Sequence, residues 1–408
     1  MNVFMNIKST IRKADGFKGN VIINFIFYLI FSLLIKKTYS KCIVKLNRVI
    51  RFIGGDVSLY FLARSYSLNG LYNEAIDLYE RVVTSSPNYI EGHYGLSEAY
   101  RLKGDNIKAR DILIPLLSSS RRLKTLLLLA NLVNTKEDFW ELISLWETKR
   151  ELFEVPIYHY YANDYLITAA LRSKQYSEAL RISNQLLDNV SSDEFYIPNL
   201  KYKEFSITAA RNALLDLKYT FEKNGHEFFL ISGTLLGCIR NNGFLGHDKD
   251  IDVGIWDNIP LPTLKHIIAC SGFFDMNPMR SPYVLRIKHV NGISIDIFYH
   301  YRDVDNYWHG GSKLKWNNKP FTLVKHFFLD AEFLIPSDYD LYLSENYGDW
   351  KIEKKNFDSA FDTKNSCICN VNELKVYVYK KLILSIASND YEKIIFFHNR
   401  LAYFNYLV

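Results

Sequence analysis

Three aspartates recur at alternate positions in the stretch HDKDIDVGI, at Asp248, Asp250 and Asp252. The alternation DIDVGI is typical of a β-strand, in which residues two apart face the same side of the sheet. Asp250 and Asp252 should therefore project together, with Asp248 near the start of the strand. Like charges this close repel each other, and the apolar neighbours Ile251 and Val253 indicate a buried strand rather than a solvated acidic turn. Because a divalent cation resolves such repulsion, we expect one to bind here.

A further carboxylate is expected from a neighbouring strand. Asn291-Gly292 is a two-residue signal for a β-hairpin turn, and it separates two predicted strands. Asp296 lies in the second strand with an isoleucine on each side, where a buried carboxylate needs a partner. Carboxylate oxygens are ligands that Mg²⁺ prefers in proteins. The sequence therefore predicts a site for Mg²⁺ or Mn²⁺ that is held by Asp250, Asp252 and Asp296.

The stretch GTLLGCIRNNG, just before the acidic run, is typical of a turn that grips phosphate. A predicted strand runs into Gly233, and an apolar helical turn follows. Glycine lets a phosphate approach the backbone, and the first amides of the new helix face the anion. Thr234 would add a hydroxyl and Arg240 a fixed positive charge. Strand-glycine-helix junctions are common, so this signal is weak by itself, but it predicts that Gly233, Thr234 and Arg240 bind substrate phosphates.

Three more residues are candidates for substrate binding. Arg286 and Lys288 lie on the predicted strand that pairs with the strand of Asp296, where they could meet phosphates or form structural ion pairs. His247 could bind phosphate or act as an acid or base, although a loop histidine more often makes a local hydrogen bond. The segment Tyr347-Gly348-Asp349-Trp350 is expected to be structural, with aromatic side chains that pack over the site.

Five segments, in this order, resemble the LicD/fukutin family of the nucleotidyltransferase-fold superfamily. They are a GTLLG-type turn, an arginine shortly after it, an acidic DxD run, the strand SIDIF and a Tyr-Gly-Asp-Trp segment. The resemblance covers about residues 203–357 and does not reach the first half of the chain. Many bacterial members carry a Trp and a tighter acidic cluster where this chain has Gly246-His247-Asp248-Lys249, which weakens the case for Asp248 as a metal ligand.

The resemblance implies metal-dependent transfer of a phospho-alcohol from a CDP-activated donor to a glycan hydroxyl, with release of CMP. Ribitol phosphate, glycerol phosphate and phosphocholine are the expected cargoes, and a lipid-linked or growing capsular or cell-wall polysaccharide is the expected acceptor. Asp250, Asp252 and Asp296 would hold Mg²⁺ against the diphosphate. Asp248 would accept the proton of the acceptor hydroxyl. A nucleotide donor implies a cytoplasmic reaction.

Two alternatives remain open at this point. The same aspartates would serve nucleotidyl transfer, which attaches a nucleoside monophosphate to a sugar or protein acceptor. Alternatively, the chain is a repeat scaffold whose transferase-like domain does not catalyse. Nucleic acid is not an expected partner, because the net charge of +6 is mild for 408 residues and no nucleic-acid-binding motif is visible.

A helical repeat precedes the acidic segments. Small and aromatic residues recur 34 positions apart, in the pairs Tyr66 and Tyr100, Gly70 and Gly104, and Ala75 and Ala109. This spacing resembles the tetratricopeptide repeat, in which small residues let paired helices approach closely. We expect three or four helical hairpins between about residues 57 and 189. They would either offer a concave docking surface to a polysaccharide-synthase partner or polymer, or serve as a spacer.

The predicted fold class is α + α/β multidomain, in which an α-solenoid is followed by a nucleotidyltransferase-like mixed α/β domain. The polar stretch SSDEFYIPNL at residues 191–200 ends the repeats. We expect a basic, apolar helical segment at 1–56, the repeat domain at 57–195, the catalytic domain at 200–368 and helices that pack on it at 369–408.

An apolar run, VIINFIFYLIFSLLI, lies near the N-terminus between basic residues, from Val21 to Ile35. As a helix its 15 residues extend about 22 Å, which is short of the roughly 30 Å of a membrane's hydrocarbon core. The run is expected either to close the N-terminal domain as a buried helix or to rest as a peripheral contact on the inner face of the membrane. An odd number of cysteines, five, is typical of a protein in a reducing cytosol.

Overall fold

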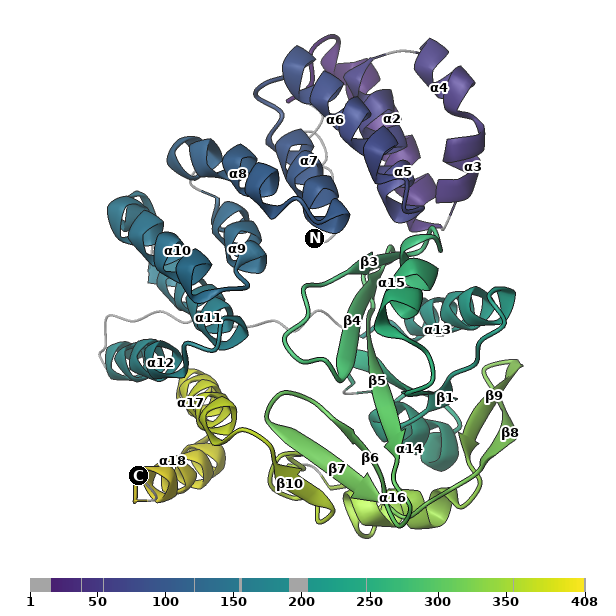
Figure 1. The fold of residues 1–408 in the computed structure, drawn as a ribbon, viewed down its shortest axis with the longest axis vertical. Helices are drawn as coiled ribbons and strands as arrows, with labels where there is room; N and C mark the ends of the chain where they lie inside the picture. The colour runs from purple at the N-terminus through teal and green to yellow at the C-terminus, as the bar shows by residue number, and fades with distance from the viewer. Residues whose placement is uncertain are drawn as a thin grey trace. The chain divides into compact units, whose positions relative to one another are not determined.

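The computed structural model describes residues 16–37, 39–53, 55–120, 122–153, 156–190, 205–246, 248–354 and 356–406. The chain divides into two compact units, one formed by Met1–Phe153 with Lys265–Asp275 and the other by Glu154–Leu264 with Met276–Val408. Figure 1 shows helices along the first half of the chain and the strands in the second. The predicted order of an α-solenoid before a mixed α/β domain is thus confirmed. The stretch 191–200, where the sequence predicts a boundary, lies outside the described residues.

The first unit is a series of helical hairpins. Three helices, α2 (Val21–Lys36), α3 (Ser40–Lys45) and α4 (Asn47–Ile53), precede the repeats. The repeat helices are α5 (Asp56–Leu68), α6 (Tyr72–Ser85), α7 (Ile90–Lys103), α8 (Asn106–Ser120), α9 (Leu123–Leu132) and α10 (Lys136–Lys149), and a short 3₁₀ turn, η1 (Arg150–Phe153), follows. Consecutive helices from α5 to α10 pack against each other. The predicted 34-residue hairpins are therefore confirmed.

Small residues in these hairpins have the roles that the repeat spacing predicts. Gly70 and Gly104 adopt φ of +73° and +97°, which side chains other than glycine rarely take, and each ends one helix before the next begins. A Cβ at Gly95 would lie 2.5 Å from the ring of Tyr79, so α7 approaches α6 closely there. The apolar run near the N-terminus forms α2, whose Tyr28, Phe31 and Ile35 are buried. No helix among the described residues is long and apolar enough to cross a membrane.

Four helices of the second unit pack together beside its sheet. The fourth predicted hairpin consists of α11 (Pro156–Arg172) and α12 (Tyr176–Val190), and the C-terminal helices are α17 (Val371–Ala387) and α18 (Tyr391–Tyr406). Helix α17 packs on both α12 and α18 (Figure 1). Leu374, Leu382 and Phe397 share one apolar cluster with Leu314 of strand β7. The C-terminal helices therefore pack on the fourth hairpin as well as on the sheet.

The sheet of the second unit is mixed. Its strands are β1 (Phe229–Leu230), β2 (Asp250–Trp256), β3 (Phe274–Met276), β4 (Val284–His289), β5 (Ser294–Arg302), β6 (Tyr307–Gly310), β7 (Leu314–Asn318), β8 (Leu323–Phe328), β9 (Ala331–Pro336) and β10 (Ser366–Ile368). The strand order is β10-β7-β6-β5-β2-β1-β9-β8, and β4 also pairs with β5. The pairs β2–β5 and β1–β9 are parallel, whereas β4–β5 is an antiparallel hairpin.

The hairpin turn differs slightly from the prediction. His289 N–H donates to the Ile293 carbonyl at 2.8 Å, so three residues rather than two connect the strands. Gly292 takes φ of +100° at the end of this connection. A two-residue turn was expected from Asn291-Gly292, and this part of the prediction is wrong. In this longer connection the side chain of Asn291 donates to the Ala209 carbonyl of α13 (Ile207–Lys223) at 2.8 Å, a long-range contact that the dipeptide does not encode.

The two faces of the central strands differ in chemistry. Ile251, Val253, Ile295 and Ile297 are fully buried on one face. Helix α13 covers this side, because His289 of β4 hydrogen-bonds Asp216 of α13 at 3.1 Å. The alternate residues of β2 and β5 project from the opposite face, and they include the aspartates that the sequence singles out.

Candidate active site

Three aspartates of the central strands project from the second face of the sheet, and a fourth precedes them in the chain. Residues Asp252 of β2 and Asp296 of β5 are direct partners in the parallel register. Asp250 lies two residues before Asp252 on the same face, and Asp248 lies just before the strand. Paired residues of neighbouring strands project to the same side of the sheet, so Asp252 and Asp296 share one face. The expectation that a second strand brings a carboxylate beside the acidic run is therefore met.

These carboxylates influence one another's protonation. Removal from water raises the pKa of Asp252 well above its ordinary value, and the nearby charges of Asp250, Asp296 and Asp248 raise it further. Desolvation also raises the pKa values of Asp250 and Asp296, whereas the positive charge of Arg286 opposes both shifts. Several carboxylates thus share one partly desolvated site whose negative charge is not fully balanced by the protein.

The donor atoms of this site suit a hard divalent cation. Within the described part of the chain, no three Asp, Glu, His or Cys side chains lie close enough to form a complete metal-binding group. Arg286 Nε donates to Asp296 Oδ2 at 3.0 Å, which occupies one carboxylate oxygen. Mg²⁺ commonly takes only one or two protein carboxylates and fills its other positions with water and substrate phosphates. The arrangement therefore fits an open site that includes Asp252, rather than a closed cage of three carboxylates.

The start of α14 (Ser232–Asn241) fixes the position of Asp252. The backbone N–H of Asp252 donates to Thr234 Oγ1 at 2.9 Å, and the backbone amide of Gly233 acts to lower the pKa of the Asp252 carboxyl. Thr234 is only 1% exposed. Its hydroxyl therefore contacts strand β2, which differs from the expected phosphate contact. The sequence identified the residue, but its partner lies 18 positions later, so the local pattern did not show its role.

Gly233 allows a close approach between the helix start and a second aspartate. A Cβ at this position would lie 3.2 Å from Asp248 Oδ1, which is tighter than ordinary contact. The preceding residue, Ser232, takes φ of +48°, a conformation that non-glycine residues rarely adopt and that often occurs at functional sites. The junction between β1 and α14 therefore packs closely against Asp248.

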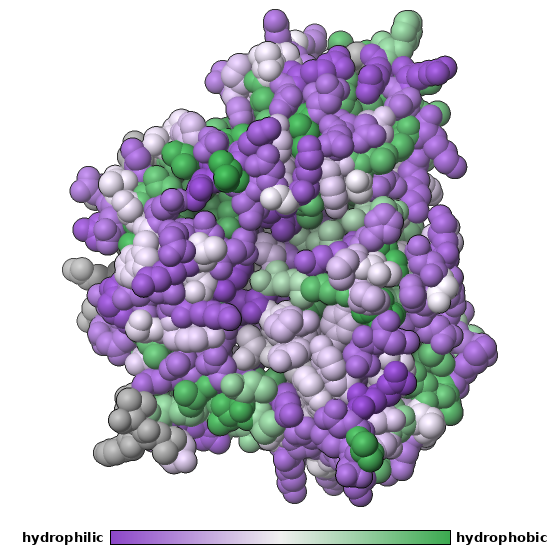
Figure 2. All heavy atoms as spheres, viewed as in Figure 1, coloured by the Kyte–Doolittle hydropathy of each residue, from purple (hydrophilic) through white to green (hydrophobic). Residues whose placement is uncertain are grey.

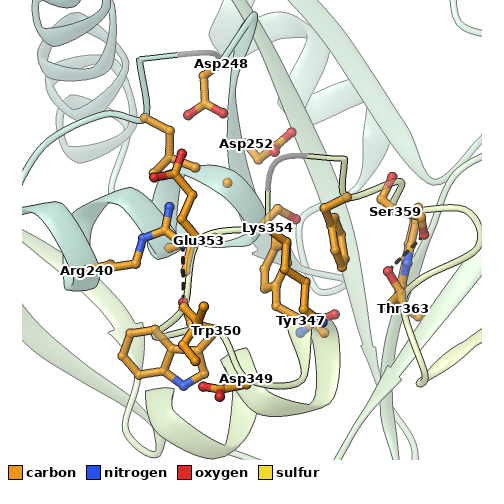
Figure 3. A pocket seen from close by; sticks show the side chains of 18 of the residues that line it. Arg240, Asp248, Asp252, Tyr347, Asp349, Trp350, Glu353, Lys354, Ser359 and Thr363 are labelled. Atoms are coloured by element: carbon orange, nitrogen blue, oxygen red, sulfur yellow. Dashed lines mark hydrogen bonds between the residues drawn. The ribbon is translucent and has the colours of Figure 1, made fainter. Parts of the chain in front are cut away.

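A pocket of about 360 Å³ opens beside Asp248 and Asp252 (Figure 3). Residues of α14, of the central strands, of α16 (Tyr339–Tyr347) and of the segment after α16 line it. This lining includes Tyr347, Asp349 and Trp350. Their place agrees with the prediction that this segment packs over the site. The nearby charge of Asp252, together with burial, holds the pKa of Tyr347 well above its ordinary range.

Two basic side chains line the pocket. Arg240 lines it, and its Nη1 donates to the Trp350 carbonyl at 3.3 Å (Figure 3). Its predicted contact with substrate phosphates stays a prediction. Lys354 also lines the pocket, and sequence reasoning missed it because it follows the last recognised motif by several residues. Arg286 and Lys288 lie on exposed positions of β4 outside the pocket lining, and Arg286 forms the structural ion pair with Asp296.

His247 lies outside the described residues, so its predicted role stays a prediction.

Aromatic side chains form another wall of the pocket. Phe298, His309 and Trp316 contribute to it, and the rings of His309 and Trp316 stack with centroids 5.3 Å apart. Burial lowers the pKa of His309 to about 3, so its ring is neutral at physiological pH. Phe298 was within reach of sequence analysis, because it lies two residues after Asp296 on the same face. The other two come from β6 and β7, whose register no local signal gives.

Comparisons with known proteins agree with this geometry. Residues 225–332 match the family model described as "LicD/FKTN/FKRP, nucleotidyltransferase domain". Ribitol-5-phosphate transferase FKTN from Mus musculus is 28% identical over 194 residues, and the human protein of the same name is 28% identical over 203 residues. Each alignment covers 45% of this chain and 40% of the relative. The uncharacterized protein RT0683 of Rickettsia typhi is 24% identical over 173 residues, which are 40% of this chain and 52% of that protein.

The chain thus spans about 40% of the length of the FKTN relatives it matches. The matched segment contains the β1–α14 junction, the acidic run and the strand of Asp296. Residues 225–332 of this chain are therefore similar to the nucleotidyltransferase domain of the LicD/FKTN/FKRP proteins.

Proposed function

We propose that the chain catalyses metal-dependent transfer of a phospho-alcohol from a CDP-activated donor to a hydroxyl of a surface glycan, with release of CMP. The observation that carries this proposal is the pairing of Asp252 with Asp296 across parallel strands, because Asp252 also lines a pocket with Arg240 and Lys354. Asp296 itself lies outside the lining of this pocket. Carboxylates and cations so arranged can hold a diphosphate through a divalent ion and through direct contacts. The family match and the name of the FKTN relatives support a transferase of this class.

The cation would be Mg²⁺ or Mn²⁺. One or two of the predicted ligands Asp250, Asp252 and Asp296 would bind it, and water and substrate phosphates would fill its other positions. When bound, it would offset the negative charge that develops on the phosphate oxygens during displacement. Thr234 contributes by holding Asp252 in place.

Arg240 and Lys354 would neutralise the phosphates of the donor. Asp248 lies beside the start of α14 and lines the pocket, where it can accept the proton of the attacking hydroxyl.

The aromatic wall offers a place for the nucleotide base. Phe298, His309 and Trp316 present ring surfaces to the pocket, and aromatic side chains commonly stack on bases. The neutral ring of His309 can contribute without the cost of burying a charge. The pocket thus brings charged side chains and aromatic rings together, as a nucleoside diphosphate requires.

The proposal extends to the group that is transferred and to the acceptor that receives it. The name of the FKTN relatives makes ribitol phosphate the first cargo to test, with glycerol phosphate and phosphocholine next. The acceptor would be a lipid-linked or growing capsular or cell-wall polysaccharide. Because the donor is a nucleotide, the reaction would take place in the cytoplasm. The repeat helices would hold the polymer or a polysaccharide-synthase partner, since stacked helical hairpins present extended surfaces for binding.

The proposal is tested by product analysis. The full chain is incubated with CDP-ribitol, CDP-glycerol or CDP-choline, Mg²⁺ and a polysaccharide acceptor, and CMP is measured by chromatography. CMP release that depends on Mg²⁺ and is lost in Asp296→Asn supports the proposal. The matched control is Asp257→Asn, an exposed aspartate one residue after strand β2. Release of pyrophosphate from CTP, with no CMP from any of the three donors, would instead indicate nucleotidyl transfer and overturn the proposal.

A further inference from the structure

Helix α2 has two apolar faces, and only one of them is covered. Tyr28, Phe31 and Ile35 form the buried stripe that packs toward α5. The opposite stripe is also apolar but remains in contact with solvent, with exposed fractions between 41% and 70% for Val21, Ile22, Ile23, Ile26, Leu29, Ile30 and Leu33. An ordinary surface helix carries polar residues on its solvent side. The exposed stripe of α2 therefore needs another explanation.

The next helices repeat this pattern. Ile43 of α3 and Ile50 of α4 are buried, and both helices pack on α5. Leu46, Val49 and Ile53 are about half exposed, and Phe52 is 91% exposed. In the view of Figure 2 the surface over the N-terminal helices is largely hydrophilic, with scattered hydrophobic residues, so the exposed fractions define the apolar side chains. We call the exposed side chains of residues 21–33 and 46–53 the α2–α4 apolar surface.

The charged residues within the segment 16–55 have a single sign. Residues 16–55 contain no Asp or Glu, and they contain seven basic residues, namely Lys18, Lys36, Lys37, Lys41, Lys45, Arg48 and Arg51. Lys36, Lys45, Arg48 and Arg51 are exposed. A helical segment with apolar side chains, basic side chains and no acidic ones matches the composition of helices that lie in the interface of an anionic membrane.

The free energies of apolar burial and of charge attraction favour contact of this surface with lipid over contact with water. Full burial of one Ile, Leu or Phe side chain contributes about 1.5–3 kcal/mol, and each basic residue near an anionic bilayer contributes about 1 kcal/mol. A protein partner could cover the apolar stripe, but the absence of acidic residues from the whole segment specifically matches a negatively charged plane. Helix α2 cannot cross a bilayer while its buried stripe packs on α5, so it would lie in the plane of the interface.

We propose that the α2–α4 apolar surface docks this chain on a bilayer of anionic phospholipids, with the exposed side chains of α2 and α4 at the acyl boundary and the surrounding Lys and Arg residues at the lipid phosphates. This inference does not rest on the proposed enzymatic function, because it concerns the first unit alone. It would place the chain at the surface where lipid-linked acceptors are found.

Vesicle binding by the full chain tests the proposal. Vesicles of phosphatidylcholine with about a third phosphatidylglycerol should retain the protein on flotation, whereas pure phosphatidylcholine vesicles should retain much less. The double substitution Ile26→Ser with Leu33→Ser should weaken partitioning about tenfold or more, because each residue contributes of the order of 1 kcal/mol when partly buried. Lys45→Glu with Arg48→Glu should weaken binding to the anionic vesicles only.

The control substitution is Val304→Ser, which changes a side chain that is 94% exposed in the second unit. It should leave vesicle binding unchanged. All variants should keep the circular dichroism spectrum of the natural sequence, because none of the altered side chains is buried.

Equal retention of the natural chain and the Ile26/Leu33 variant would overturn the proposal. So would a dimer of the natural chain, seen by light scattering without lipid, that the same variant abolishes, because the surface would then be an interface between copies. Neither result bears on CMP release.

Discussion

The backbone N–H of Asp252 donates a hydrogen bond of 2.9 Å to the side-chain hydroxyl of Thr234. This contact joins the start of α14 to strand β2. The aspartate at the centre of the proposed site is therefore held at its backbone. Such support is what a catalytic carboxylate needs in order to keep a fixed orientation.

The first prediction concerns this hydroxyl. Thr234→Val keeps the shape of the side chain but leaves the buried amide of Asp252 unpaired. We expect the free energy of unfolding to fall by about 1–3 kcal/mol, which urea titration measures. Because Asp252 would lose its support, kcat should fall more than the KM for the donor changes. Thr234→Ser retains the hydroxyl and should recover most of both losses; if the valine variant is as stable and active as the serine variant, the hydrogen bond has no such role.

The second prediction concerns pH and stability. The pKa of Asp252 is raised in the folded chain, chiefly by desolvation, relative to about 3.9 in the unfolded chain. Between these two values the folded state binds more protons, so stability falls as pH rises through the interval. In the absence of divalent cations, Asp252→Asn should therefore gain thermal stability relative to the natural chain as pH rises from about 4 toward neutrality.

The thermal unfolding midpoints of the two proteins, measured across this pH range in a chelating buffer, check the second prediction. Asp257→Asn, whose carboxylate is exposed, should give a difference that does not change with pH. If the difference in unfolding midpoint between Asp252→Asn and the natural chain is the same at every pH, the pKa of Asp252 is not raised in the folded chain.

The third prediction concerns the close approach at Gly233. Gly233→Ala would place a methyl group 3.2 Å from Asp248 Oδ1, so the carboxylate must shift. Because Asp248 is the proposed base, we expect kcat to fall by about tenfold or more, as removal of a positioned base typically costs about 10²–10⁴-fold. Gly243→Ala is the matched control, since its nearest neighbour, the Asn241 carbonyl, would lie 3.8 Å away. Steady-state rates of CMP release distinguish the two variants, and equal rates would exclude a role for this approach.

The fourth prediction concerns the lysine that sequence reasoning missed. Lys354 is exposed but lines the pocket, so Lys354→Gln should leave the fold intact. Loss of a contact to a charged phosphate costs about 1.5–3 kcal/mol, which corresponds to a rise in the KM for the donor of roughly tenfold to a hundredfold. Lys364→Gln removes an exposed lysine that does not line the pocket and should have no effect. An unchanged KM in the first variant would remove Lys354 from the phosphate site.

Features set by short-range periodicity could be predicted from the sequence. The alternation of Asp250 and Asp252 gives their common face directly, because every strand alternates in this way. The 34-residue spacing gives the helical hairpins, because each repeat packs on its neighbour through the same positions. Both predictions needed no knowledge of distant contacts.

Features set by long-range pairing could not be predicted. Asp252 and Asp296 are 44 residues apart, and their direct pairing depends on the register between their two strands. Nothing in either segment fixes this register. The same limit applies to His309 and Trp316, which reach the pocket through the β5–β6–β7 pairing. The segment Lys265–Asp275 belongs to the first unit, and this too depends on a contact between distant parts of the sequence, the ion pair of Asp275 with Arg64.

Direct measurement of Mn²⁺ binding in the presence of CDP tests the central claim, which is that the paired aspartates hold a divalent cation against a diphosphate. Electron paramagnetic resonance of Mn²⁺ can follow this without any turnover. The account predicts that the natural chain and Asp257→Asn bind Mn²⁺ together with CDP, and that Asp252→Asn and Asp296→Asn lose this binding. Equal Mn²⁺ binding by all four proteins, or none by the natural chain, would contradict it.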